Sequence, residues 1–222
     1  MTESIIGKNV IESLTTGMYE NPLFVYREYI QNAADAVDHA VKAGILQKGE
    51  ETISIRIKDE RQEIIIEDNA TGIESAKSFS ILRNIAKSTK QKGIDKGFRG
   101  IGRLGGLAYC QKLTFVTSYK GEEVKSIVTW DAGKLQNLIN DTVDKSSGEE
   151  VVKKVTYFES KKEDKEKHYF KVIMEDVTLG DLLNVDEVTN YLQMVAPIDI
   201  KSSFLYKKEI QKFMNEHQLS VD

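Results

Sequence analysis

A chain of 222 residues is long enough for one large domain, or for one domain and the start of another, without disulfides or metal ions to stabilise a small core. The net charge of −4 and the pI near 5.6 exclude a general attraction to polyphosphate backbones, so we expect no direct nucleic-acid partner for this segment. A single cysteine, no basic leader and no run near the roughly 18 apolar residues that cross a bilayer predict a cytoplasmic chain with no membrane partner.

Hydrophobic periodicity divides the first half of the chain into helices and one β-hairpin. Apolar positions at helical spacing, with Pro22 suited to open a helix and Gly44 to end one, predict three helices, over residues 5–15, 22–43 and 74–83. Two alternating runs joined by polar residues predict a hairpin with one buried face, formed by ISIRIK from Ile53 and EIIIED from Glu63. Residues 84–106 are rich in glycine, and we expect a mobile loop there that runs into a helix N-terminus.

The second half of the chain is first rich in β-branched and aromatic residues and then helical again. Four more strands are predicted, starting near Lys112, Val124, Val151 and His168. The charge run SKKEDKEK, residues 160–167, is interpreted as the solvated tip of a hairpin. Helical patterns return over residues 185–195 and 204–217. We therefore expect a main domain over residues 1–183 and a helical extension over residues 184–222.

A polar stripe marks the long predicted helix. At 3.6 residues per turn, Glu28, Asn32 and Asp35 fall within roughly 60° of one another. Apolar residues such as Ile30 and Val37 lie on the opposite side. An amphipathic helix with its polar side in solvent shows the same pattern, so the stripe alone identifies no site.

Two further segments contain residues suited to a nucleotide. Asp68 stands at the end of a predicted strand, where a carboxylate can accept a hydrogen bond from an exocyclic amine, and Gly72 in the next turn lets backbone approach a flat ring. The segment KGFRGIGRLGG, residues 96–106, leaves backbone N–H groups near a helix N-terminus, which suits a chain of phosphates. Each segment also has a simpler explanation, as a turn-forming aspartate and as a flexible hinge without a ligand.

In this order and at these separations, the three segments resemble the GHKL superfamily, which has the Bergerat ATP-binding fold and includes heat-shock protein 90, gyrase and MutL. REYIQNAADA, residues 27–36, resembles the family's first motif. By that resemblance Glu28 is the general base that polarises the attacking water, Asn32 ligates Mg²⁺, and Asp35 supports the site. Histidine kinases of the superfamily lack this glutamate, so Glu28 favours hydrolysis over phosphoryl transfer to histidine.

Asp68 to Ile73 resembles the second motif, DxGxG, whose aspartate reads the adenine amino group. Gly72 matches the second glycine, and Ile73 follows it in the binding segment. Two positions depart from the family pattern. Ala70 replaces the first glycine, so the backbone there must tolerate a Cβ. Phe170 stands where many relatives carry a threonine of the adenine-site water network, so either that network differs or another residue supplies the hydroxyl.

The glycine-rich segment resembles the family's GxxGxG phosphate motif, and its GFRG resembles MutL. The resemblance implies that backbone amides over residues 99–103 donate to the phosphates. The expected nucleotide contacts in this segment are Gly97, Phe98, Arg99, Gly100, Ile101, Gly102 and Arg103. Lys87 and Ser88, in the preceding IAKSTK sequence that resembles the lead into the heat-shock protein 90 lid, are additional expected contacts.

The resemblance implies a two-layer α/β sandwich, with a mixed sheet of roughly six to eight strands covered on one face by helices. The implied activity is Mg²⁺-dependent ATP hydrolysis to ADP that drives switching of a larger protein, which forms a homodimer when ATP is bound. Turnover by this fragment should be slow, because relatives complete the γ-phosphate site with a basic residue from the following, transducer-type domain.

Two alternatives stay open at this point. The domain could be a nucleotide-gated interaction module with negligible hydrolysis, in which ATP binding shifts a conformational equilibrium. It could also be a structural α/β domain that has lost its nucleotide. The client or pathway cannot be read from the sequence, because chaperone, DNA-repair and defence proteins share this domain.

Overall fold

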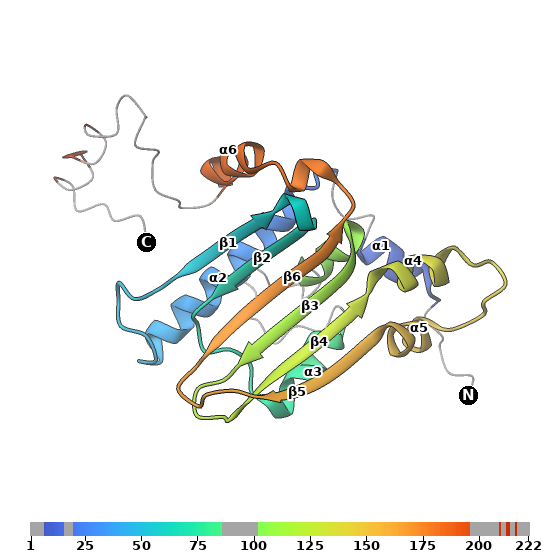
Figure 1. Cartoon of the computed structure of the whole chain (residues 1–222), viewed down its shortest axis with the longest axis horizontal. Coiled ribbons are helices and arrows are strands. Elements are labelled where there is room, and N and C mark those ends of the chain that lie inside the picture. The colour runs from blue at the N-terminus through green and yellow to red at the C-terminus, as the bar shows by residue number, and fades with distance from the viewer. Residues whose placement is uncertain are drawn as a thin grey trace.

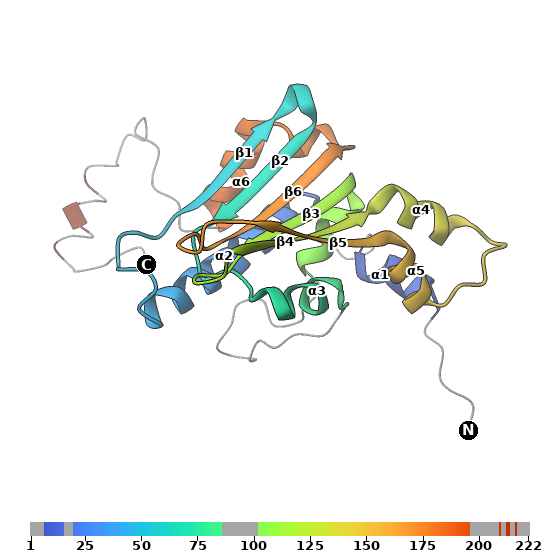
Figure 2. The ribbon, with the colours of Figure 1, turned by 60° about the horizontal axis from the view of Figure 1, so that its bottom comes forward.

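A six-stranded sheet with helices on one face forms the body of the protein (Figure 1). The structure is a computed structural model that describes residues 7–15, 20–85 and 102–195, and further along the chain residues 209, 212, 213 and 216. Seen from the side, the sheet forms one layer and α2 and α3 lie in the other (Figure 2). The predicted two-layer α/β sandwich is confirmed.

The strands and helices of the described part alternate along the chain. The strands are β1 Ile53–Lys58, β2 Glu63–Asp68, β3 Cys110–Ser118, β4 Val124–Asp131, β5 Thr156–Lys162 and β6 Tyr169–Val177. The α-helices are α1 Asn9–Thr15, α2 Phe24–Lys42, α3 Ser75–Arg83, α4 Ala132–Asn140, α5 Gly148–Val155 and α6 Val185–Val195. Short 3-10 helices are η1 Asp59–Arg61, η2 Gly102–Ala108 and η3 Gly180–Leu182.

The strand order is β1-β2-β6-β3-β4-β5, and all five described pairings are antiparallel. The sheet is therefore antiparallel where the sequence led us to expect a mixed one. The physical reason is the position of β6, which lies between β2 and β3 and runs opposite to both. Without β6, the strands β2 and β3 would be parallel neighbours joined through α3, as in a mixed sheet.

The core lies between the sheet and its helices. Trp130 of β4, Tyr26 of α2 and Phe115 of β3 are its largest fully buried side chains. On β2, Ile64 and Ile66 point to this face because side chains alternate along a strand. The same alternation turns the side chain of Asp68, the last residue of β2, toward the helices.

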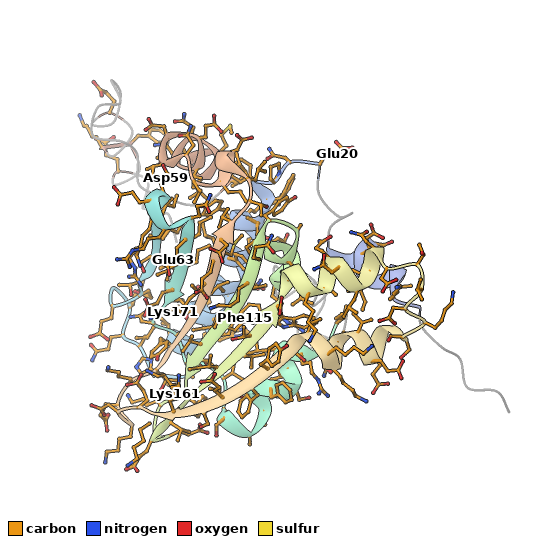
Figure 3. All side chains as sticks on the ribbon, turned by 45° about the vertical axis from the view of Figure 1, so that its right-hand side comes forward. Glu20, Asp59, Glu63, Phe115, Lys161 and Lys171 are labelled. Carbon is orange, nitrogen blue, oxygen red and sulfur yellow. The ribbon has the colours of Figure 1, made fainter. Side chains whose placement is uncertain are left out.

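The opposite face of the sheet carries cross-strand ion pairs. Glu67 of β2 binds Arg56 of β1 at 2.6 Å and Lys171 of β6 at 3.3 Å. Figure 3 shows the charged side chains on the ribbon, with Glu63 and Lys171 labelled on their strands. Exposed pairs of this kind each contribute little to stability, so this face is a solvated surface and the core lies on the helix side.

The long helix α2 follows the prediction closely. It begins at Phe24, after a turn in which the N–H of Val25 donates to the carbonyl of Pro22 at 3.1 Å. It ends before Gly44, whose φ of +70° is a backbone conformation that glycine adopts without strain. The hydroxyl of Tyr26 donates to the carbonyl of Leu182 at 2.6 Å, which ties α2 to the segment that leads into α6.

The strand predicted from Val151 is wrong in its first half. Residues 151–155 belong to α5, and only the following residues form β5. The cause is a capping box at Ser147, whose hydroxyl accepts from the N–H of Glu150 while the Glu150 side chain accepts from the N–H of Ser147. This cap stabilises a helix despite the β-branched residues. The helix α4, which Asp131 caps through the N–H of Lys134, had not been predicted.

The charge run over residues 160–167 is not a hairpin tip. β5 pairs with β4 and β6 pairs with β3, so the segment between β5 and β6 crosses the β3–β4 turn. The N–H of Glu163 donates to the carbonyl of Glu123, and the side chain of Glu163 contacts Lys125 at 3.2 Å and Lys167 at 3.3 Å. The backbone bond to Glu123 and the ion pair with Lys125 anchor the crossing to the β3–β4 hairpin.

Two predicted features lie largely outside the described residues. The glycine-rich loop is described only at its ends, and the helix expected over residues 204–217 is described at four single positions. The proposed boundary at residues 183 and 184 falls between η3 and α6. Within the described ranges, no helix has both the length and the apolarity needed to cross a membrane.

Candidate nucleotide site

Asp68 is a buried carboxylate at the C-terminal end of β2. Its side chain lies on the helix-covered face of the sheet, and only 4 % of the residue is exposed. One of its oxygens, Oδ1, accepts a hydrogen bond from the N–H of Ala70 at 3.0 Å. Burial raises the pKa of Asp68 to about 7, although backbone hydrogen bonds from Ala70 and Phe170 act in the opposite direction. A carboxylate so poorly hydrated is a ready acceptor for a ligand donor.

The turn after Asp68 is held from two sides. On one side, Asn69 pairs with the approach to β1: its Oδ1 accepts from the N–H of Thr52 at 2.9 Å, and its Nδ2 donates to the carbonyl of Glu50 at 2.7 Å. On the other side, Nδ1 of His168 lies 2.9 Å from the carbonyl oxygen of Ala70. The turn is therefore a rigid part of the fold.

Ala70 occupies the position at which the sequence departs from the glycine of the family motif. The residue is fully buried, and it packs in a small cluster with Val37 and Ala40 of α2 and with Leu46. Its φ is not positive, since Gln62 and Asp176 are the non-glycine residues with positive φ among those described. The backbone therefore tolerates the Cβ, and the methyl group fills space between the turn and α2.

Gly72 is required by both its conformation and its surroundings. Its φ is +70°, and a Cβ there would overlap the backbone carbonyl of Ser118. Next to it, the N–H of Ile73 donates to Oγ1 of Thr117 at 2.8 Å, and that hydroxyl donates onward to the carbonyl of Tyr169 at 3.1 Å. Thr117 thus ties the turn to β3 and β6, although no motif in the sequence marks this residue.

Phe170 lies directly opposite Asp68 in the β2–β6 pairing and directly opposite Thr117 in the β3–β6 pairing. It therefore lies beside Asp68, the carboxylate predicted to bind the adenine amino group. The nearest hydroxyl on the same face of the sheet belongs to Thr117, one strand further along. That hydroxyl is already engaged with two backbone groups.

The polar stripe of α2 is not a solvent-facing surface. Asp35 is buried, with 5 % of the residue exposed, and Glu28 and Asn32 are half-buried. Gly102 packs so closely against Glu28 that a Cβ on this glycine would overlap the carboxylate. The C-terminal end of the glycine-rich segment therefore meets the helix at Glu28, which is the arrangement expected if both contact one ligand.

The side chain of Arg103, a residue whose backbone is expected to contact phosphate, binds the end of α3. Its guanidinium donates to the carbonyl of Ile81 at 2.8 Å and to that of Asn84, so it caps the end of α3. Burial lowers the pKa of Arg103 to about 10. The backbone is also fixed, since the hydroxyl of Tyr29 donates to the carbonyl of Arg103 and accepts from the N–H of Gly106. Tyr29 is a second residue that sequence reasoning missed.

Part of the expected phosphate site lies outside the described residues. Seven predicted contacts lie outside the described residues, namely Lys87, Ser88, Gly97, Phe98, Arg99, Gly100 and Ile101. Within the described ranges, no group of three or more His, Cys, Asp or Glu side chains could hold a metal ion. The Mg²⁺ site expected at Asn32 is of another kind, in which an amide oxygen and phosphate oxygens share the ion.

Comparison with known proteins matches most of the chain to one family of ATPases. Residues 20–169, more than half of the chain, match the family described as histidine kinase-, DNA gyrase B- and HSP90-like ATPase. The chain is 26 % identical over 158 residues to a protein named chaperone protein HtpG from Shewanella baltica strain OS155, covering 63 % of this chain and 25 % of that protein. It is 26 % identical over 156 residues to the HtpG of Nitrosospira multiformis, covering 62 % and 24 %.

These relatives are much longer proteins, and the chain spans about a quarter of their length. The likeness to them therefore concerns one domain. The family match covers α2, the Asp68 turn, η2 and the strands up to the start of β6, which are the elements that carry the predicted site. By this match the chain belongs to the histidine kinase-, DNA gyrase B- and HSP90-like ATPase family.

Proposed function

We propose that this domain binds Mg-ATP between α2 and the sheet and hydrolyses it slowly, as the nucleotide-dependent switch of a larger protein. The observation that carries the proposal is that α2 packs against both segments expected to bind the nucleotide, the glycine-rich segment and the Asp68 turn. On the polar side of the helix Glu28 packs against Gly102, and on its apolar side Val37 shares a buried cluster with Ala70 of the Asp68 turn.

The base end of the site would be formed by the Asp68 turn. Asp68 would accept a hydrogen bond from the exocyclic amine of adenine, because its carboxylate is buried and its position is fixed by the turn. Gly72 lets the backbone come close to a flat ring, and the bond from Ile73 to Thr117 holds that backbone in place.

The phosphate end would lie where η2 meets α2. Asn32 would hold Mg²⁺, and the ion would neutralise charge that builds up on the phosphates. Glu28, one helical turn away, would accept a proton from the water that attacks the terminal phosphate. The backbone over residues 99–103 would donate to the phosphates, by resemblance to the family's glycine motif.

One feature favours a second candidate, an ATP-gated interaction module with negligible turnover. Phosphoryl transfer depends on a cation at the developing charge, and such a group can change turnover by about 10³ to 10⁵. The guanidinium of Arg103 is already bound to two carbonyl groups at the end of α3. If no other group of this chain supplies the cation, hydrolysis would require a basic residue from a following domain, and a dimer would form only in a longer protein.

The test compares Glu28→Ala, Asn32→Ala and, as a matched control, Gln31→Ala, which changes a neighbouring residue of the same helix outside the polar stripe. Calorimetry with Mg-ATP should show near wild-type binding for Glu28→Ala and weaker binding for Asn32→Ala. Phosphate release should fall about 10²- to 10⁴-fold for Glu28→Ala, since a general base is lost. Equal loss of binding in both variants would refute these roles, and wild-type phosphate release near zero would favour the gated module.

A further inference from the structure

One row of side chains crosses the sheet at the level of Asp68, on the face that the helices cover. The strand pairings place its members in neighbouring strands as Ile53, Asp68, Phe170, Thr117 and Ser126. Asp68 therefore has an isoleucine on one side and a phenylalanine on the other. Side chains directly opposite each other in antiparallel strands are about 4.5 to 5.5 Å apart at Cβ, so both flank the carboxylate closely.

The ring of Phe170 is fixed in this position. It packs against the main core, and it stacks on the fully buried ring of Phe115, with centroids 5.9 Å apart and planes inclined by 27°. Such stacking holds the ring next to Asp68 instead of letting it turn into solvent. The hydroxyl of Thr117, on the far side of the ring, is engaged with Ile73 and Tyr169.

Asp68 itself is buried, with 4 % of the residue exposed, whereas its neighbour Ile53 on the edge strand is 37 % exposed. Burial is the largest influence on its pKa, which it raises, and the groups that oppose this shift are backbone hydrogen bonds. In a purine that donates its exocyclic amine to Asp68, the adjacent ring nitrogen N1 lies on the same edge of the base. A water molecule that donates a hydrogen bond to N1 needs space and at least two polar partners. Ile53 and Phe170 offer neither beside the carboxylate.

We propose that Phe170 determines how the base is recognised. Its ring excludes water beside Asp68, so that the protein forms a hydrogen bond with the exocyclic amine of adenine and none, direct or through water, with N1. This inference rests on the proposed ATP site. It makes Phe170 a specificity-determining residue, whose ring limits which base atoms exchange hydrogen bonds with the protein. A nucleotide that lacks N1 but keeps the amine should therefore bind as well as ATP.

The experiment measures dissociation constants by calorimetry for three nucleotides with Mg²⁺: ATP, 1-deaza-ATP, which lacks the N1 acceptor, and inosine triphosphate, which lacks the amine. For the wild-type chain we expect 1-deaza-ATP to bind within about 2-fold of ATP and inosine triphosphate to bind at least about 10-fold more weakly. Phe170→Thr, which opens space and adds a hydroxyl, should introduce a preference of about 3- to 10-fold for ATP over 1-deaza-ATP. Phe170→Leu, the matched apolar control, should show no such preference.

A wild-type preference of 10-fold or more for ATP over 1-deaza-ATP would overturn the inference while leaving the ATP site intact, and this measurement needs no variant to fold. A Phe170→Thr chain that binds ATP and still shows no preference would also overturn it. Failure of the wild-type chain to bind ATP, or equal binding of ATP and inosine triphosphate, would instead refute the proposed function and the inference together.

Discussion

Replacing Asp68 by asparagine should stabilise the protein while it removes the base contact. The side chains have the same shape, and the amide oxygen can still accept from the N–H of Ala70. The variant lacks the charge whose burial raises the pKa of Asp68 from 3.8 to about 7. A residue retained at a cost to stability is typical of a binding or catalytic site.

The magnitude follows from the pKa. Since the folded state binds the Asp68 proton more tightly than the unfolded chain, the free energy of unfolding falls as the pH rises from about 4 to about 7, and this group has no further effect above that. A shift of about 3 units at 1.36 kcal/mol per unit corresponds to at most about 4 kcal/mol. Asp68→Asn escapes this loss, so its advantage should be near zero at pH 4 and largest above pH 7.

The assay is chemical denaturation of both chains at several pH values between 4 and 8.5, in parallel with ATP titration. Subtracting the two stability curves removes the contribution of every other titrating group that the substitution leaves unchanged. ATP binding should be strongly weakened, because an amide NH₂ facing the adenine amine places two donors together. A variant less stable than wild type at pH 8, or a stability difference that does not vary with pH, would show that the carboxylate is not desolvated as described.

Three other substitutions test the supporting contacts. Ala70→Gly should lower the free energy of unfolding by about 1 to 2 kcal/mol, since a buried methyl is lost and glycine gains freedom in the unfolded chain, yet leave ATP affinity unchanged in calorimetry. Thr117→Val should cost about 1 to 3 kcal/mol and weaken ATP binding, because the N–H of Ile73 loses its acceptor, and Thr117→Ser should restore both. Ser147→Ala should cost about 1 kcal/mol in thermal unfolding with no change in ATP binding, and a larger loss would mean that the cap does more than start α5.

Local patterns allowed much of the fold to be predicted. The bounds of the β1–β2 hairpin and of α6 agree with the prediction, because their periodicity and turn signals are consistent. The first half of the strand predicted from Val151 was wrong, since a helix cap at Ser147, four residues upstream, outweighed the β-branched composition. The antiparallel sheet was missed because the insertion of β6 between β2 and β3 is a long-range pairing that no local pattern contains.

In the candidate site, too, some residues could be predicted from the sequence and others could not. The motif residues Glu28 and Asp68 could be selected from sequence, because the family resemblance assigns them by spacing. The supporting residues could not, since Thr117 and Tyr29 act through backbone groups far away along the chain. The effect of Ala70 also needed the structure, because only the contact with α2 shows where its methyl group goes.

The position of β6 has a consequence for biosynthesis. The strands β2 and β3 receive their shared neighbour from residues 169–177, so the sheet stays in two halves until the ribosome has made nearly the whole domain. During that interval the facing edges of β2 and β3 would expose unpaired backbone groups, which other chains can pair with. A nascent chain shorter than about Val177 should therefore remain protease-sensitive and depend on chaperones, and the side of the proposed base site that Phe170 forms would be among the last parts of the domain to form.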